Sequence, residues 1–330
     1  MTQAPRPCVY YGKDLARYGF GEGHPFGPDR LEAFWRMCRD RGLDRRLAIR
    51  APVRADREAL ARFHTCDYLD RLEAHSRRGE GFLDYGDTPA FPGVLEAAEY
   101  VAGSVLDAID RLISGACHRA FVPIAGLHHA RRDSAAGFCA INDCGIAIET
   151  LKRKYGLTRI AYVDIDAHHG DGVFYAFEAD PAVIFVDLHE DGRFLYPGTG
   201  AVTETGQGPG RGLKLNIPMP PEAGDALVEK IWPRVEAFLE RHRPRFFLLQ
   251  AGADSLAGDP ITHLAYSAET HRRVTARLCR LADRHADGRL LAVGGGGYNR
   301  DNLAAAWCAV VEAMLAGDER EAADTGSPWA

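Results

Sequence analysis

Two aspartates and a histidine alternate along one short segment, Asp164-Ile165-Asp166-Ala167-His168. In an extended backbone, residues two apart point to the same side, so Asp164, Asp166 and His168 would share one face. Two carboxylates and an imidazole held close together are unfavourable unless something bridges them. The spacing therefore predicts a site for a divalent metal ion, in preference to a polar network that only closes the end of a strand.

A third candidate ligand is Asp254, in the segment GADSLAGDP at 252–260, directly after the apolar run FFLLQ. An aspartate after a strand is often the N-cap of a helix. Here it can instead complete a set of Asp166, His168 and Asp254. Three protein ligands leave a coordination position open, which is typical of a catalytic metal. These oxygen and nitrogen donors suit Zn²⁺, and also Fe²⁺, Co²⁺ or Mn²⁺.

Adjacent histidines, His128 and His129, stand in the segment GLHHA after another apolar run. Imidazoles exchange protons near neutral pH, so the pair is a candidate for general acid and base catalysis. Asp164 and Asp171 are left over from the predicted ligand set and lie close to it in sequence. Each carboxylate could orient one of the two imidazoles.

Four glycines at 294–297 precede Tyr298. Glycines allow a backbone to approach a site closely, and a mobile loop here could bring the phenol to a reacting group. A tyrosine hydroxyl can donate a hydrogen bond to an oxyanion. No Lys-Ser or Lys-Thr pair follows the glycines, which argues against a phosphate-binding P-loop. Together, a metal, two histidines and a tyrosine predict hydrolysis of an amide by metal-activated water.

The elements that would position these residues alternate between apolar runs and longer amphipathic segments. Predicted strands cover 120–124, 159–166, 182–188, 212–217, 246–251 and 289–293, and predicted helices cover 94–113, 142–155, 225–241, 268–285 and 302–315. Continuous apolar runs are typical of strands buried on both faces of a parallel sheet. The alternation predicts an α/β fold in which sites form beyond the carboxyl ends of the strands. Asn142 is the expected N-cap of its helix.

The composition and net charge of the chain argue against some classes of protein function. The chain has 330 residues, 40 Lys and Arg against 46 Asp and Glu, and a net charge of −6. This balance argues against a nucleic-acid partner. The first residues lack the apolar core of a secretory signal and no long apolar stretch predicts a membrane span, so we expect a cytoplasmic protein. The eight scattered cysteines are expected to be reduced and mostly buried.

Taken in order, GLHHA, GFCAIND, DIDAHHGDG, YPGTG, GADSLAGDP and GGGGYN resemble the zinc-dependent histone deacetylases and the bacterial acetoin-utilisation deacetylase-like proteins. The resemblance covers about 10 to 307. It implies a single arginase-like α/β domain, over 1–316, with a central and mostly parallel eight-stranded sheet flanked by helices. Residues 317–330 would then be a flexible tail. The oligomeric state is not indicated.

The resemblance also implies a role for each matching residue. Metal ligands would be Asp166, His168 and Asp254, and catalytic residues His128, His129, Asp164, Asp171 and Tyr298. The substrate would contact Asp87 at the rim, the tunnel residues Gly137, Phe138 and Tyr196, and the gatekeeper position at Ile261. Arg30 would line an inner acetate channel. A structural K⁺ would lie near Asp164, Asp166, His168, Asp187 and Leu188; eukaryotic members often have Ser at the position of Asp187.

The implied reaction is removal of an acetyl or other short acyl group from a lysine side chain of a protein or peptide. Three alternatives stay open. Small acetylated amines such as polyamines are one, although polyamine-specific members have an acidic gatekeeper where this chain has Ile261. A ureohydrolase would need carboxylates for a second metal. A catalytically inactive acyl-lysine binder would not need every ligand, both histidines and the tyrosine.

Overall fold

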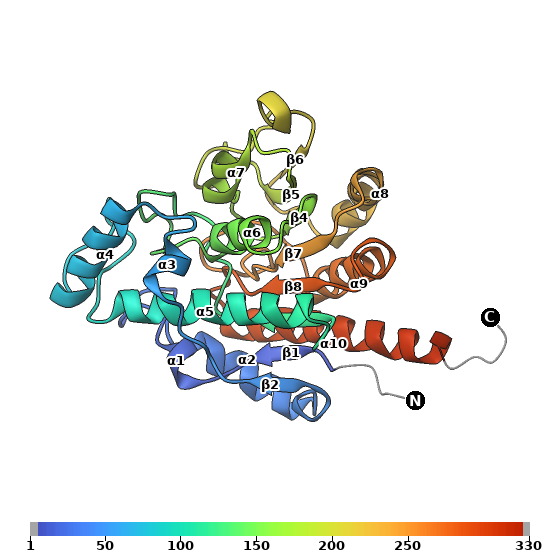
Figure 1. Ribbon diagram of the computed structural model, residues 1–330, viewed down its shortest axis with the longest axis horizontal. Coiled ribbons are helices and arrows are strands. Elements are labelled where there is room, and N and C mark those ends of the chain that lie inside the picture. The colour runs from blue at the N-terminus through green and yellow to red at the C-terminus, as the bar shows by residue number, and fades with distance from the viewer. Residues whose placement is uncertain (1–5, 326–330) are drawn as a thin grey trace.

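One sheet of eight parallel strands crosses the molecule, as the computed structural model shows in Figure 1. The structure describes the backbone of residues 6–325 and the side chains of residues 6–316. The strands follow the order β2-β1-β3-β8-β7-β4-β5-β6. Their bounds are β1 Cys8–Tyr10, β2 Ala48–Arg50, β3 Arg119–Val122, β4 Ile160–Asp164, β5 Val183–Glu190, β6 Lys214–Met219, β7 Phe246–Gln250 and β8 Leu290–Val293.

The six predicted strands are confirmed as β3 to β8, and most of them are shorter than predicted. Every residue of β3, β4, β5, β7 and β8 is buried, as expected for strands covered on both faces. The pattern did not predict β1 and β2, each of three residues, which extend the sheet at one edge. Segments this short carry too few residues to show a period.

Helices cover both faces of the sheet. They are α1 Lys13–Ala16, α2 Arg30–Asp40, α3 Arg57–Leu60, α4 Cys66–Arg78, α5 Val94–Ile113, α6 Asp143–Arg153, α7 Asp171–Phe177, α8 Asp225–His242, α9 Ala268–His285 and α10 Arg300–Thr325. In Figure 1, α5 and α6 lie in front of the sheet and α10 passes behind α5. Helix α10 packs against α9 and α2, while α5 packs against α6 and β3. The result is the three-layered α/β architecture that the alternating pattern predicted.

Helix ends follow local sequence signals where these are present. The Asn142 side chain accepts a hydrogen bond from the Gly145 N–H at 2.8 Å, which confirms it as the N-cap of α6. Helix α10 extends to Thr325, beyond the predicted end at residue 315. The expected tail at 317–330 therefore overlaps this helix, and 326–330 lie outside the described residues. Helices α1 to α4 and α7 were not predicted.

Strand register brings the carboxyl ends of neighbouring strands level with one another. Asp164 at the end of β4 pairs with Gln250 at the end of β7, and Gln250 pairs with Val293 at the end of β8. Val122 at the end of β3 pairs with the same Val293. The loops that follow these four adjacent strands therefore leave one edge of the sheet side by side. They are the loops that contain the three predicted metal ligands, the adjacent histidines and Tyr298.

Two further expectations concern the whole chain. Across 6–325, none of the helices combines the length and apolar character that crossing a bilayer requires. None of the eight cysteines, which all lie within the described residues, forms a disulfide, and seven of them are buried, Cys66 being the exposed one. Buried thiols outside any disulfide agree with the prediction of a reduced set.

Candidate metal and acid–base site

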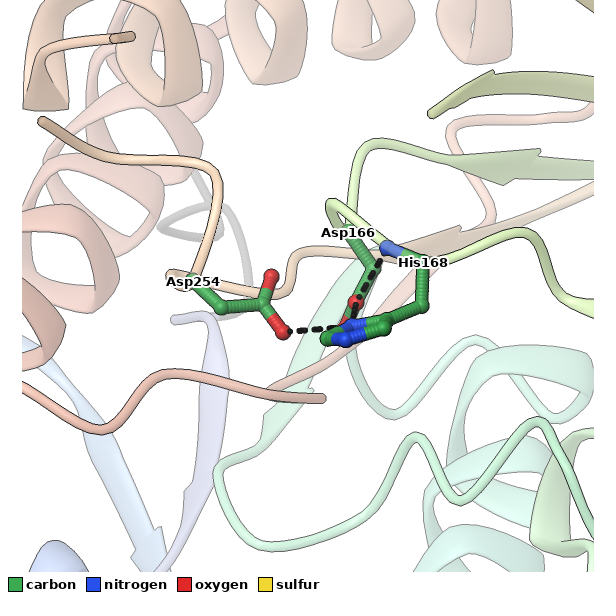
Figure 2. Close-up of side chains that lie close together, drawn as sticks. All are labelled: Asp166, His168 and Asp254. Atoms are coloured by element: carbon green, nitrogen blue, oxygen red, sulfur yellow. Dashed lines mark hydrogen bonds and ion pairs between the residues drawn. The ribbon is translucent and has the colours of Figure 1, made fainter. Parts of the chain in front are cut away.

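Asp166, His168 and Asp254 meet beyond the ends of β4 and β7 (Figure 2). His168 Nδ1 lies 3.0 Å from Asp166 Oδ1 and 3.1 Å from Asp254 Oδ2. One ligand atom from each residue lies within 4.8 Å of the other two, and all three side chains are buried. Figure 2 shows the two carboxylates converging on the same ring nitrogen. The predicted ligand set is therefore assembled in space.

The electrostatics of this cluster fit a bound cation. Burial alone would lower the pKa of His168, but Asp166 and Asp254 outweigh it and raise that pKa to about 10. Burial and the charge of Asp166 raise the pKa of Asp254 to about 7. Both pKa shifts arise because the cluster places negative charge where water is excluded. A divalent ion would balance two carboxylates and bind the imidazole in its neutral form, so the residues present fit a metal.

Neighbouring groups hold the ligand carboxylates in position. Gln250 Nε2 donates to Asp166 Oδ2 at 2.8 Å, and the Gly296 N–H donates to the same oxygen at 2.9 Å. The Ala167 N–H donates to Asp254 Oδ1 at 2.9 Å. Contacts of this kind fix the orientation of ligand oxygens. Gln250 was not predicted as a site residue, although a glutamine that ends an apolar strand at this edge of the sheet was an available signal.

The two adjacent histidines face each other in front of separate carboxylates. His128 Nδ1 lies 2.8 Å from Asp164 Oδ2, and His129 Nδ1 lies 2.7 Å from Asp171 Oδ1. The two Nε2 atoms are 3.1 Å apart. If each Nδ1–H is donated to its carboxylate, the short contact between the Nε2 atoms needs one proton shared between them. The pair can therefore hold one extra proton between the two rings, and that proton can pass from one ring to the other.

Burial sets the protonation of this pair. Burial, followed by the proximity of His128, lowers the pKa of His129 to about 4, so His129 is neutral at pH 7. Burial opposes ionisation of Asp171, but the hydrogen bond to His129 outweighs it and lowers the pKa of Asp171. Burial and the charges of Asp187 and Asp166 raise the pKa of Asp164 well above its usual range. A neutral imidazole beside an ionised carboxylate is the arrangement of a general base.

The start of α6 shapes the loop that carries the histidines. Both oxygens of Asp143 accept backbone N–H groups, from Gly126 at 2.9 Å and Leu127 at 2.7 Å. Asn142 Nδ2 donates to the carbonyl oxygens of His128 and Ala130. These contacts turn the backbone so that both imidazoles enter the site. The motif GFCAIND contained these two residues, but the role of Asn142 as more than an N-cap was not predicted.

Tyr298 lies beside the metal-ligand cluster, in edge contact with Phe138 at 5.9 Å between ring centroids. Burial and the charges of Asp254 and Asp166 raise its pKa well above 10, so its hydroxyl stays protonated as a donor. The loop that carries it makes backbone hydrogen bonds to two other parts of the site. Hydrogen bonds join the Gly295 N–H to Ala125 at 2.7 Å and the Gly296 N–H to Asp166.

A cavity of about 750 Å³ opens above the site, and Asp87, Gly137 and Tyr196 are among its lining residues. The Tyr196 ring centroid lies 5.1 Å from that of His129. Gly137 has φ of 52°, and a Cβ there would lie 2.5 Å from the His129 ring. Phe138 packs against Tyr298 below the rim. Phe138 and the three predicted metal ligands are not among the lining residues, so this cavity covers the rim and not the whole of the predicted tunnel.

Ile261 is placed differently. Among the described residues, it does not line the entrance cavity, and its N–H donates to Asp259 at 3.1 Å.

Arg30 is fully buried behind the site, with Nη2 at 2.6 Å from the Gly295 carbonyl oxygen. Asp187 is bonded to His189 Nδ1 and to the Gly170 N–H, both within 3 Å.

Comparisons with known proteins agree with this geometry. A family model described as "Histone deacetylase domain" matches residues 24–314. The acetoin utilization protein AcuC of Bacillus subtilis is 35% identical over 307 residues, covering 88% of this chain and 76% of the relative. A probable deacetylase of Archaeoglobus fulgidus is 35% identical over 298 residues, covering 88% and 81%. Histone deacetylase RPD3 of Saccharomyces cerevisiae is 32% identical over 312 residues, covering 92% and 70%.

Among solved structures, the crystal structure of the HDA15 HD domain matches with a TM-score of 0.85 and 26% sequence identity. The match covers 96% of this chain and 90% of that one. It therefore extends over both the sheet and the loops at its carboxyl edge.

Proposed function

Because the chain belongs to the histone deacetylase family, we propose that it removes acetyl or other short acyl groups from lysine side chains of proteins or peptides. Family membership itself makes the chain a deacetylase, a metal-dependent hydrolase. The proposal adds the acyl-lysine substrate and the residues that act on it. The observation that carries it is the convergence of three metal-ligating side chains and two carboxylate-paired histidines below one entrance cavity.

We assign the metal to Asp166, His168 and Asp254, with Zn²⁺ as the first candidate and Fe²⁺ or Co²⁺ as alternatives. When bound, the ion would polarise the amide carbonyl and acidify water. A K⁺ near Asp187 and Leu188 is a further proposal. The catalytic domain would comprise 1–316 and act in the cytoplasm, without a nucleic-acid partner.

The protein side chains would divide the remaining work. His129, neutral and bonded to Asp171, would take a proton from the attacking water. The proton would pass through the contact with His128 to the departing amine. The protonated Tyr298 hydroxyl would donate to the oxyanion as the carbonyl becomes tetrahedral. Phe138 and Tyr196 would enclose the aliphatic stem of the lysine and exclude water.

Small acetylated amines are the second substrate class that the site favours. The entrance cavity is lined by the carboxylates of Asp84 and Asp87, which would attract the cationic end of such a molecule. The same lining contains Arg71 and Arg131, so the rim is mixed in charge and suits a peptide as well. Turnover of acetyl-lysine peptides against acetylpolyamines, measured side by side, decides between the two.

The sharpest test uses Tyr298→Phe, which keeps the ring and the metal ligands. Loss of one oxyanion donor typically lowers kcat by about 10²- to 10³-fold, with little effect on ground-state binding. We expect slow turnover of an acetyl-lysine peptide and near wild-type affinity for a hydroxamate, with unchanged metal content. A wild-type protein that binds acyl-lysine peptides but turns over no acyl-amine would instead be an inactive binder.

A further inference from the structure

The peptide group between Gly297 and Tyr298 is held at both of its ends by side chains. Its carbonyl oxygen accepts a hydrogen bond from Arg30 Nε at 2.9 Å. Its N–H donates to Asp259 Oδ2 at 2.9 Å. Arg30 reaches this group from the start of α2, whereas Asp259 reaches it from the loop after β7. Two parts of the chain far apart in sequence therefore fix one peptide plane, immediately before the tyrosine side chain.

Glycine makes such restraint necessary. Gly297 has φ of 122°, which is a conformation that other residues rarely adopt. A glycine has little conformational preference of its own, so the direction in which the backbone enters Tyr298 depends on hydrogen bonds. Arg30 is itself held in place, because it is fully buried and its guanidinium carbon lies 4.0 Å from the centroid of the Phe26 ring.

Asp259 accepts hydrogen bonds both from its own turn and from a distant residue. Its Oδ1 accepts the Ile261 N–H at 3.1 Å, a local contact that any short turn can make. Its Oδ2, in contrast, accepts the N–H of Tyr298, which is 39 residues away. The side chain is 8% exposed, so little water competes for this bond. Asp259 also follows the metal ligand Asp254 by five residues in the same loop.

We propose that Asp259 is a positioning residue that sets where the Tyr298 hydroxyl stands relative to the metal ligands. The inference rests on the proposed function, in which that hydroxyl stabilises the oxyanion. Asp259 touches neither substrate nor metal in this scheme. It acts by connecting the loop that supplies Asp254 to the loop that supplies Tyr298, so that the two groups keep a fixed separation during the reaction.

The test is a double-mutant cycle with Asp259→Asn and Tyr298→Phe. The Ile261 and Tyr298 N–H groups go to different oxygens of Asp259, and an amide has only one oxygen to offer, with an NH₂ group in place of the other. A small misplacement of a catalytic group can cost up to about 10²-fold in rate. We expect Asp259→Asn to lower kcat by about 10- to 100-fold, with KM, hydroxamate affinity and metal content close to wild type. In the Tyr298→Phe background, Asp259→Asn should cost nothing further, because the hydroxyl that it positions is gone.

Equal losses of kcat in both backgrounds would overturn the proposal and leave Asp259 with a general structural role. Asp301→Asn, an exposed acid near the same loop, is the matched control and should leave kcat unchanged. If Asp259→Asn lowers the melting temperature too far, Asp259→Ser, which keeps one acceptor, replaces it in the cycle.

A second readout does not depend on turnover. Amide hydrogen exchange of the peptide containing Tyr298 should accelerate in Asp259→Asn and not in Asp301→Asn, at equal metal content. Unchanged exchange would contradict the proposal. A wild-type protein without turnover would contradict the proposed function, and exchange would still report whether Asp259 restrains the loop.

Discussion

The two adjacent histidines of the site have different surroundings, and this difference supports the separate roles proposed for them. His129 is enclosed by Asp171 on one side and by the Tyr196 ring on the other, with its pKa lowered to about 4. His128 lies against Asp164, and its Nε2 is 4.0 Å from Oδ1 of Asp166, one of the proposed metal ligands. A neutral ring under the entrance suits proton abstraction from water. His128, whose Nε2 lies 3.1 Å from that of His129, is placed to receive the proton from it.

At this scale, the ligand and base assignments are tested by comparing Asp254→Ala with His129→Ala. Asp254→Ala removes one of three ligands, and we expect metal content to fall well below one ion per chain. His129→Ala removes no ligand, so metal content should stay at the wild-type value while kcat falls by about 10²- to 10⁴-fold. Elemental analysis and steady-state kinetics on the same preparations measure both quantities.

Either assignment can fail separately. Full metal occupancy in Asp254→Ala would show that the ion binds elsewhere. A His129→Ala protein with nearly full kcat would exclude the base role, and a His129→Ala protein that loses its metal would show that His129 supports the ligands instead.

Among the elements, the rim loop and the tunnel wall are joined by one buried hydroxyl. Thr88 Oγ1 accepts the Phe138 N–H at 3.0 Å and donates to Asp84, whose other oxygen accepts three backbone N–H groups of the rim loop. Phe138 has φ of 67°, an unfavourable conformation for a residue with a side chain. Its carbonyl accepts from Tyr18, so both peptide groups beside it are held. The rim that contains Asp87 and the wall that contains Phe138 therefore move together.

Thr88→Val should disturb both parts at once. Valine has the same shape but leaves the Phe138 N–H and one Asp84 oxygen without a partner, at a cost of about 1–3 kcal/mol in the free energy of unfolding. We expect a raised KM for acetyl-lysine peptides, because Phe138 is no longer held against the lysine stem. Thr88→Ser keeps the hydroxyl and should restore KM. Denaturant unfolding and kinetics on both variants check this, and a KM equal to wild type in Thr88→Val would refute the coupling.

For the whole molecule, buried histidines make folding sensitive to acid. Burial lowers the pKa of His64 and of His271 to about 4, from an ordinary value of 6.5. Neutral His64 accepts the Asn142 N–H at 2.9 Å, which places it under the N-cap of α6. Below pH 6.5 the unfolded chain binds protons at these histidines, whereas the folded chain does not until about pH 4. The contribution of these two neutral histidines to the free energy of unfolding is therefore fully present above pH 6.5 and is lost as the pH falls from 6.5 to 4.

Each of these histidines should contribute about 3 kcal/mol to this loss, and the slope per histidine should be about 1.4 kcal/mol per pH unit. We expect the free energy of unfolding, measured in urea between pH 7 and pH 4.5, to decrease steeply. His64→Gln, which does not titrate, should have a shallower slope over the same interval. Identical slopes in wild type and His64→Gln would show that His64 is not neutral in the fold for the reason given.

The sequence alone indicated the chemistry proposed for the site and determined the class of the fold. The alternation of Asp166 and His168 after an apolar run predicted that both would share one face of a strand. The two side chains do lie together, but β4 ends at Asp164 and both residues stand in the bend that follows it, so the strand period is not the reason. Parallel strands explain why Asp254 and the histidine pair, from other runs, lie beside them: their carboxyl ends meet at one edge. These inferences need only residue type, local spacing and the general geometry of α/β sheets.

Only the tertiary structure decided which side chains support that chemistry. Gln250, Asp259 and Thr88 are ordinary polar residues in the sequence, and their roles come from partners 39 to 84 residues away. The same holds for the tyrosine loop, where the four glycines gave no sign of the hydrogen bonds to Arg30 and Asp259. Local sequence restricts the conformations open to a segment. Which hydrogen bonds form between distant segments is fixed when the sheet and helices pack, and that information is not contained in any short stretch of the chain.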